Sequence, residues 1–167
     1  NPAFKGQLIV PDVRGSDSFP PFWSALLGRY GELFLTRVRD LQPRVYASGV
    51  PATNALAAGE GAVHIPSVGQ QIEGPKAKGA PLAMVIPDFT TGLEISMALA
   101  HPSKAPHPNA GRLFANFVMS LEGNALFNQD PGSISVYDTS RLPKQYEAPK
   151  HEEVERRDVY LKLLGQK

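Results

Sequence analysis

Short apolar runs recur along the first half of the chain, and longer stretches with helical spacing separate them. Leu8–Val10 is a short run rich in β-branched residues that Pro11 closes, which is typical of a buried strand leading into a loop. Residues 44–46 and 62–65 repeat this pattern, and a further apolar run spans residues 82–86. The pattern therefore predicts four short strands.

The stretches between these runs show the spacing of amphipathic helices. Apolar residues recur every three or four positions over residues 22–30 and again over residues 33–41, and Gly31 separates the two stretches. Two further helices are predicted at residues 52–58 and 68–78. Strands that alternate with helices over short connections form βαβ units, so we expect an α/β fold with a mainly parallel sheet flanked by helices.

The pattern changes after residue 87. Residues 90–99 are expected to be extended, and prolines interrupt residues 102–108. A helix is predicted at residues 109–119, with large apolar residues along one face. The residues of this face are Leu113, Phe114, Phe117 and Val118. The second half therefore lacks the regular alternation of the first.

Three further features complete the second half. Ser120 is a good N-cap for a helix that begins at the next residue. Residues 130–148 are rich in proline, glycine and serine and are predicted to be irregular, whereas residues 152–164 predict a charged helix. The change in pattern divides the chain into two predicted domains, residues 1–86 and residues 87–167.

Composition narrows the class of protein. Of the 167 residues, 42% are hydrophobic and 20% are charged, which is the range of globular proteins. The formal net charge of +1 gives no electrostatic reason to expect nucleic acid or an anionic membrane as a partner. The chain has no cysteine, which excludes disulfides and thiolate metal ligands. It begins at Asn1 without the pattern of a secretory signal peptide, and we interpret it as part of a longer or processed chain.

Three glycine- and serine-containing turns are predicted where strands lead into helices. They are Arg14–Ser18, Ser48–Val50 and Pro66–Gly69. Ligands of open α/β sheets bind at such junctions, where helix starts offer unpaired N–H groups and glycines allow close approach. We expect the turns to form a cradle for an anionic or polar group, with Arg14 as a charged fork. In the alternative interpretation, the serines simply cap their own helices.

Catalytic patterns are absent from the sequence. There is no Gly-x-Ser-x-Gly elbow, no histidine pair at helical spacing and no phosphate-binding loop that ends in Lys-Ser or Lys-Thr. We interpret His64 as an interior histidine, His101 and His107 as exposed loop residues, and Asp12 and Asp17 as turn residues. We therefore expect neither an enzyme nor a cofactor or metal site.

Several segments, taken in order, resemble a known family. The segments are Lys5–Asp12, Gly15-Ser16, Phe22-Trp23, Val45–Pro51, Ala55–Glu60, Lys76–Leu82, His107–Phe114 and Met119–Gly123. Their order and spacing resemble those of extracellular solute-binding proteins of the ferric-iron type, which serve ABC importers, and the first three segments resemble the start of the second lobe of these proteins.

The resemblance implies a two-lobed clamp of the type II periplasmic-binding-protein class. Residues 1–86 would be lobe two, and residues 87–167 would be the hinge return, with a hinge at residues 88–92, and the incomplete, helical C-terminal part of lobe one. The implied partners are a small ligand in the cleft between the lobes, the permease subunits of the importer and the missing N-terminal half. The implied location is the periplasm.

One departure from the family bears on the ligand. Ferric-binding members carry two adjacent tyrosines after the strand that matches residues 62–65, and this chain has Pro66–Gly69 there. We therefore expect a small anionic or polar ligand, such as a phosphate, phosphonate or carboxylate, while a metal complex stays open. The predicted ligand-binding residues are Arg14, Gly15, Ser16, Ser18, Tyr46, Ser48, Gly49, Ser67, Val68 and Gly69.

Two other functions stay open at this point. The chain could bind no ligand alone and instead assemble with the missing half or with a swapped copy, through the apolar face of the helix at residues 109–119. An α/β enzyme would need a nucleophile and a base in contact, and the sequence shows no such pair.

Overall fold

The computed structural model describes residues 1–91, 105–129 and 133–166. The described residues form two compact units. Unit 1 comprises residues 1–93 and 143–167, and unit 2 comprises residues 94–142.

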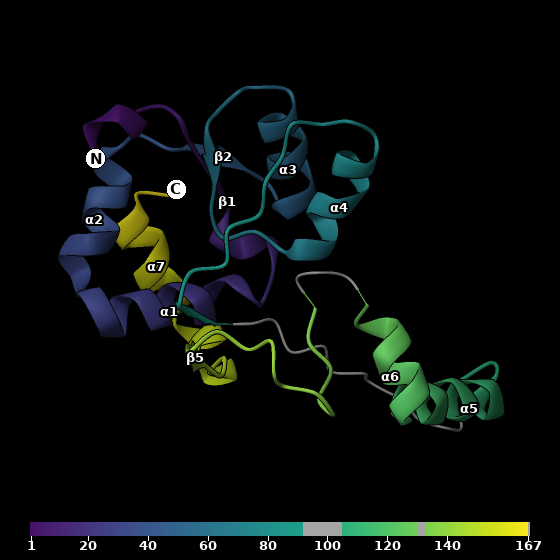
Figure 1. The fold of residues 1–167 in the computed structure, drawn as a ribbon. Coiled ribbons are helices and arrows are strands. Elements are labelled where there is room, and N and C mark those ends of the chain that lie inside the picture. The colour runs from purple at the N-terminus through teal and green to yellow at the C-terminus, as the bar shows by residue number, and fades with distance from the viewer. Residues whose placement is uncertain (92–104, 130–132, 167) are drawn as a thin grey trace. The chain divides into compact units, whose positions relative to one another are not determined.

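A three-stranded parallel sheet lies at the centre of unit 1. β1 (Leu8–Pro11) lies between β2 (Arg44–Tyr46) and β3 (Val63–His64), and both neighbours run parallel to it (Figure 1). Ile9 pairs with Arg44 of β2 and also with His64 of β3. Because all three strands run the same way, their carboxyl ends meet at one edge of the sheet.

Helices cover both faces of this sheet. Figure 1 shows α1, α2 and α7 on one side and α3 and α4 on the other. The helices of unit 1 are η1 (Pro2–Phe4), η2 (Val13–Gly15), α1 (Phe19–Tyr30), α2 (Glu32–Asp40), α3 (Gly49–Ala57), α4 (Gly69–Ala77), η3 (His151–Arg156) and α7 (Arg157–Leu164). The arrangement explains why β1 reads as a continuous apolar run, since a strand covered on both faces has no polar side.

The two faces of β1 pack into separate clusters. Leu8 and Val10 point into the larger one, and Ile9, one residue out of phase, points into the smaller one beside α3. The fully buried anchors of the larger cluster are Val13, Trp23, Leu35 and Tyr160, from four different elements. The central strand therefore holds the helices of both layers.

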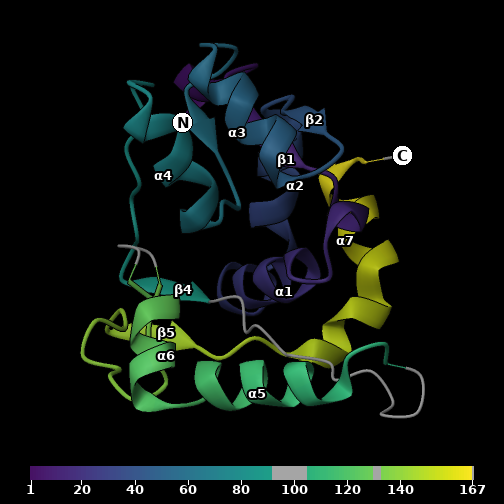
Figure 2. The ribbon, with the colours of Figure 1, turned by 90° about the vertical axis from the view of Figure 1, so that its right-hand side faces the viewer.

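A second, two-stranded sheet joins residues 143–167 to the rest of unit 1. β4 (Phe89–Thr91) and β5 (Gln145–Glu147) are parallel neighbours, and Figure 2 shows them next to α1. The Phe89 ring lies 6.0 Å from the Tyr30 ring, and the guanidinium of Arg29 lies 4.4 Å above Phe89. These contacts fasten β4 to the end of α1.

Two strand predictions are wrong. Residues 82–86 form no strand, and Val85 is 84% exposed. The strand lies instead at β4, beyond Pro87, and β5 falls within residues 130–148, which we expected to be irregular. An apolar run indicates that residues can be buried, but it does not show whether a neighbouring strand is available to form hydrogen bonds with them. The presence of such a neighbour decides which residues become a strand.

The compact units also differ from the predicted domains in two respects, since the first boundary lies after residue 93 and the C-terminal residues belong to the first unit. The predicted boundary at residue 86 placed residues 143–167 with the second domain, whereas the structure groups them with residues 1–93. Tyr160 and Leu164 of α7 are buried in the larger cluster of unit 1. A charged amphipathic helix carries no sequence signal for which sheet it covers, so this packing was not predictable from periodicity.

Unit 2 contains two consecutive helices that cross each other at a large angle (Figure 2). α5 (Pro108–Val118) and α6 (Leu121–Phe127) are joined at Ser120, whose Oγ accepts a hydrogen bond from the Gly123 N–H at 3.1 Å. The predicted helix and the predicted cap are both confirmed. Most of the segment predicted to be extended, residues 90–99, lies outside the described residues.

The structure confirms the α/β class in its general form. Across the described ranges it holds seven α-helices and short parallel sheets. In those same ranges, no helix combines the length and the apolar character needed to span a bilayer. The finer assignment to a type II periplasmic-binding-protein lobe stays a prediction.

The layered packing of unit 1 predicts a sharp contrast within α2. Leu35 is fully buried and Leu33 is 61% exposed, two residues apart on the same helix. We expect Leu35→Ala to lower the free energy of unfolding by about 2–5 kcal/mol. Leu33→Ala should change it by less than about 0.5 kcal/mol. Urea denaturation of both variants measures the difference, and equal effects would contradict the layer assignment.

Candidate functional site

A small cavity opens where the three parallel strands end. Its volume is about 290 Å³. The lining residues are Gly15, Ser16, Ser18, Phe19, Ser48, Gly49, Val50, Val68, Gln70 and Gln71. They come from the turns after β1, β2 and β3. In the strand order β2-β1-β3, the next strand in sequence, β2, lies on one side of β1, and the following strand, β3, lies on the other side. Ligands of open α/β sheets bind at the position where the strand order reverses in this way.

The turns pack directly against one another. A Cβ atom on Gly15 would lie 2.3 Å from the Ala47 carbonyl oxygen, and one on Gly49 would lie 2.4 Å from the Gln71 Oε1. Real Cβ atoms do not approach other atoms so closely, so only glycine fits either position without a shift of its neighbour. The first turn thus touches the second, and the second touches the third.

The serine hydroxyls divide between the two roles left open by the sequence. The Oγ atoms of Ser16 and Ser18 lie 2.8 Å apart, and Ser16 Oγ also accepts a hydrogen bond from the Ser18 N–H at 3.2 Å. These two serines therefore stabilise their own turn. Ser48, at the N-cap of α3, makes no side-chain capping bond. Its hydroxyl has no structural role of that kind.

Two helix starts supply backbone donors at the cavity. The first N–H groups of α3 (Gly49 and Val50) and of α4 (Gly69 and Gln70) have no acceptor within their own helix, and neither helix has a side-chain cap. Of these four residues, Gly49, Val50 and Gln70 line the cavity. The positive ends of both helix dipoles lie here too.

The start of α1 differs from those of α3 and α4. Pro20 and Pro21 have no N–H, and the Phe19 N–H already donates to the Ser16 carbonyl oxygen at 3.2 Å. The expectation of free donors at the start of α1 is therefore wrong. Backbone recognition at this cavity depends on α3 and α4.

The β3–α4 side of the site holds buried polar atoms without partners. Within the described ranges, these include Gln71 Oε1, Ser67 Oγ and His64 Nε2. A buried polar atom with no hydrogen bond costs about 1–3 kcal/mol. Gln71 also lines the cavity, so a hydrogen-bond donor of a ligand or a water molecule placed there would satisfy its Oε1.

His64, on β3, does not line the cavity. Its Nδ1 is 3.4 Å from the Oγ1 of Thr53, which in turn donates a hydrogen bond to the Gly49 carbonyl oxygen at 3.0 Å. Burial lowers the pKa of His64 to about 4, so the ring is neutral at neutral pH. The residue thus links β3 to the first turn of α3, in agreement with its interpretation as an interior histidine.

Six of the ten predicted ligand-binding residues line the cavity. They are Gly15, Ser16, Ser18, Ser48, Gly49 and Val68. The other four, Arg14, Tyr46, Ser67 and Gly69, do not line it.

The two large side chains among those four have other partners. The guanidinium of Arg14 forms a fork with Asp12, with N–O distances of 2.9 and 2.6 Å, and these bonds hold the pKa of Asp12 below its ordinary value. The Tyr46 hydroxyl donates to the Glu60 carboxylate at 2.5 Å, which raises the pKa of Tyr46. Local sequence spacing does not show these partners, so both side chains seemed available for a ligand.

Three lining residues lie outside the predicted turns, namely Phe19, Gln70 and Gln71, and a fourth, Val50, lies within the predicted turn Ser48–Val50 but was not among the predicted ligand-binding residues. Each lies in the first turn of a helix, immediately after or within a turn that was predicted to bind. Extending each predicted turn by one helical turn would have found them.

A larger open hollow of about 630 Å³ lies between α3 and α4 and shares Val50 and Gln71 with the cavity. Its other lining residues are Asn54 on α3, Gly74 and Pro75 on α4, and Lys78, Gly79 and Ala80 just beyond the end of α4. Helix surfaces present few backbone donors, so this hollow lacks the chemistry of the cavity.

No ionisable side chain occurs among the residues that line the cavity. Over the described ranges there is also no cluster of three or more His, Asp or Glu side chains that would hold a metal ion. The arrangement offers backbone N–H groups, hydroxyls and one amide oxygen. Such groups bind a polar or anionic ligand by hydrogen bonds.

Comparison with known proteins leaves the family open. No protein-family model matches the sequence, and neither a curated protein nor a solved structure matches the chain. The resemblance to solute-binding proteins is therefore a prediction from the residues quoted above.

The half-buried position of His64 predicts a pH-dependent stability. The pKa is about 4 in the folded chain and about 6.5 in an unfolded one, so the unfolded state binds more protons between these values. The free energy of unfolding should therefore fall as the pH is lowered from about 6.5 to about 4. In His64→Leu this part of the slope should disappear. Urea denaturation across this range tests it, and an unchanged slope in the variant would assign the pH dependence to other groups.

Proposed function

We propose that this chain is the ligand-binding part of a solute-binding protein that serves an ABC importer. The observation that carries the proposal is the meeting of three strand-to-helix turns in one cavity at the carboxyl edge of a parallel sheet. The fold proposed for unit 1 is a type II periplasmic-binding-protein lobe, and the location proposed is the periplasm.

The chemistry of the cavity supports a small anionic or polar ligand. Backbone N–H groups at two helix starts complement negative charge without a basic side chain. A volume of about 290 Å³ fits a ligand the size of a phosphate, a phosphonate or a small carboxylate better than a large organic molecule. Without tyrosines in the lining, direct capture of ferric ion is not part of the proposal.

The mechanism proposed is binding without chemistry. A second lobe would close over the ligand by a hinge motion, and the closed form would dock on the permease subunits of the importer. Since no titratable side chain lines the cavity, the lining offers no general base or acid, which supports a binding protein over an enzyme. Gly92, part of the predicted hinge, lies outside the described residues.

Calorimetry with two glycine variants tests this function. The probes are inorganic phosphate, methylphosphonate, citrate and ferric citrate. Gly15→Ala places a methyl group against the Ala47 carbonyl oxygen and should weaken binding by about tenfold or more, since a loss of 1.4 kcal/mol is tenfold in affinity. Gly28→Ala, in an open position of α1, should bind like the wild type. Binding of ferric ion alone, or equal affinities of the two variants, would overturn the proposal.

A second candidate function, assembly through unit 2, has one observation in its favour. Large apolar side chains of α5 and α6 are exposed, from 43% at Phe127 to 72% at Leu113. The others are Phe114, Phe117, Leu121 and Leu126. Monomers rarely expose so many apolar groups together, and such faces mark contacts with other chains. A swapped copy, or a separate chain that supplies the other half of a solute-binding protein, would cover this face.

Light scattering tests the assembly. The wild type should run as a dimer or larger species at micromolar concentration, and Leu113→Glu should shift it to the monomer. Leu33→Glu, at a comparably exposed leucine of unit 1, is the matched control and should leave the assembly unchanged. A monomeric wild type would argue against swapping between copies.

A further inference from the structure

The C-terminal end of α7 reaches the first turn of the cavity. The Oε1 of Gln166 accepts a hydrogen bond from the Val13 N–H at 2.9 Å, and its Nε2 donates to the Pro11 carbonyl oxygen at 3.3 Å. Gln166 is 8% exposed, and both partners are buried. The Gln166 side chain therefore bridges Pro11 and Val13, the two residues on either side of Asp12. Both lie more than 150 positions before Gln166 in the chain.

A left-handed turn at Gly165 places Gln166 there. Gly165 ends α7 with φ 68° and ψ 25°, and the Gln166 N–H returns to the Leu161 carbonyl oxygen at 2.9 Å. A Cβ atom on Gly165 would lie 2.8 Å from the Cγ of Arg39 on α2. The turn therefore needs glycine both for its backbone angles and for its packing.

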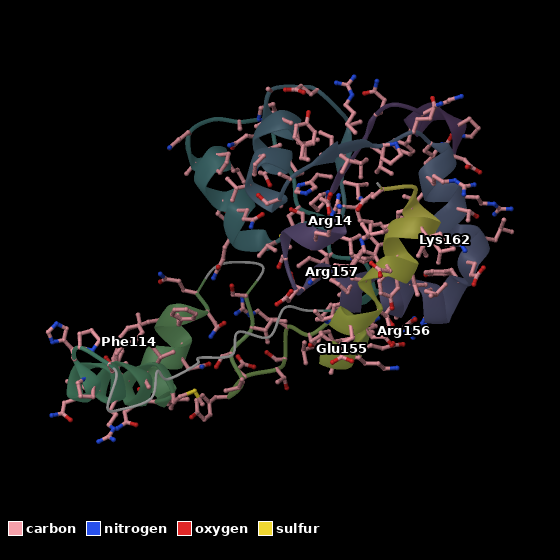
Figure 3. All side chains as sticks on the ribbon, turned by 180° about the vertical axis from the view of Figure 1, so that it is seen from behind. Arg14, Phe114, Glu155, Arg156, Arg157 and Lys162 are labelled. Carbon is pink, nitrogen blue, oxygen red and sulfur yellow. The ribbon has the colours of Figure 1, made fainter. Side chains whose placement is uncertain are left out.

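A second contact joins the same helix to the other end of the turn. The Nη2 of Arg157, the first residue of α7, lies 2.6 Å from the Oδ1 of Asp17. Figure 3 labels Arg157 on α7 and Arg14 on the neighbouring turn. The start and the end of α7 thus contact the two ends of residues 11–17.

The remaining bonds of the turn are mostly local. Asp12 bonds Arg14, and Ser16 bonds Ser18. The Asp12 N–H donates to the Tyr46 carbonyl oxygen at 2.7 Å, which joins the turn to β2 at one point. Gly15 lies against Ala47 only while the turn keeps its place, and Gln166 fixes the residues that lead into it.

We propose that α7 and the residues that follow it hold the turn at residues 11–17 in place beside the cavity. Gln166 is the principal positioning residue of this turn, and Arg157 is a second one. The part of this proposal that concerns ligand affinity rests on the proposed function. The part that concerns the turn does not, so the two are tested separately.

Amide hydrogen exchange measured by NMR tests the effect on the turn. Gln166→Met keeps the size of the side chain and removes both hydrogen bonds, so the Val13 amide should exchange about tenfold faster. The amides of Ile9 and Val10 in β1 should keep their wild-type rates. Gln7→Met, the same substitution at an exposed position before β1, should change none of them.

Gln166→Glu adds a conservative comparison. It keeps an acceptor for the Val13 N–H but places an acceptor opposite the Pro11 carbonyl oxygen, so its effect at neutral pH should be intermediate. If Gln166→Met does not fold, Asp17→Asn removes the second contact without a change in α7 and should speed exchange at residues 17 and 18. Unchanged exchange at the turn, or equal acceleration throughout β1 and the turn, would overturn the proposal.

Calorimetry with inorganic phosphate then tests the link to binding. If the wild type binds, Gln166→Met should weaken the affinity by about three- to tenfold, as expected for the loss of one or two hydrogen bonds that hold a turn. Unchanged affinity with faster exchange would overturn the link to the ligand. If the wild type binds none of the four probes, the proposed function fails, and the exchange result alone decides whether α7 positions the turn.

Discussion

The parallel pairing of β1 with two neighbours is the constraint on which the rest of unit 1 depends. Because β2 and β3 both run with β1, their carboxyl ends meet at one edge, and the three following turns meet there too. Burial on both faces fixes the register, since a slip of one residue would move Ile9 from one cluster to the other. The cavity is therefore a consequence of how the core is packed.

The same geometry decides how the cavity can recognise charge. Its lining holds no basic side chain, and the one arginine nearby in sequence, Arg14, forms a fork with Asp12. Positive potential comes from the starts of α3 and α4, whose N–H groups are fixed by the helices themselves. Fixed dipoles need no reorganisation when a ligand arrives, which suits a protein that binds and releases its ligand unchanged.

The sequence predicted those parts of the fold well whose signals are local. The run at Leu8–Val10, the break at Gly31 and the cap at Ser120 each depend on neighbours within a few positions. The misses are all long-range. The strand at Gln145–Glu147, in a segment predicted to be irregular, is set by its pairing with Phe89–Thr91, and the packing of α7 into unit 1 crosses most of the chain. Periodicity carries no information about such partners.

The site follows the same division. Six lining residues were predicted from glycine and serine at strand ends, whereas the partners of Arg14 and Tyr46 were not.

The most direct test of the account is whether the turns touch. A nuclear Overhauser spectrum should show cross-peaks between the Hα protons of Gly15 and Ser48, and between Gly49 Hα and the Gln71 side-chain amide. Assigned resonances without these cross-peaks would contradict the convergence of the turns.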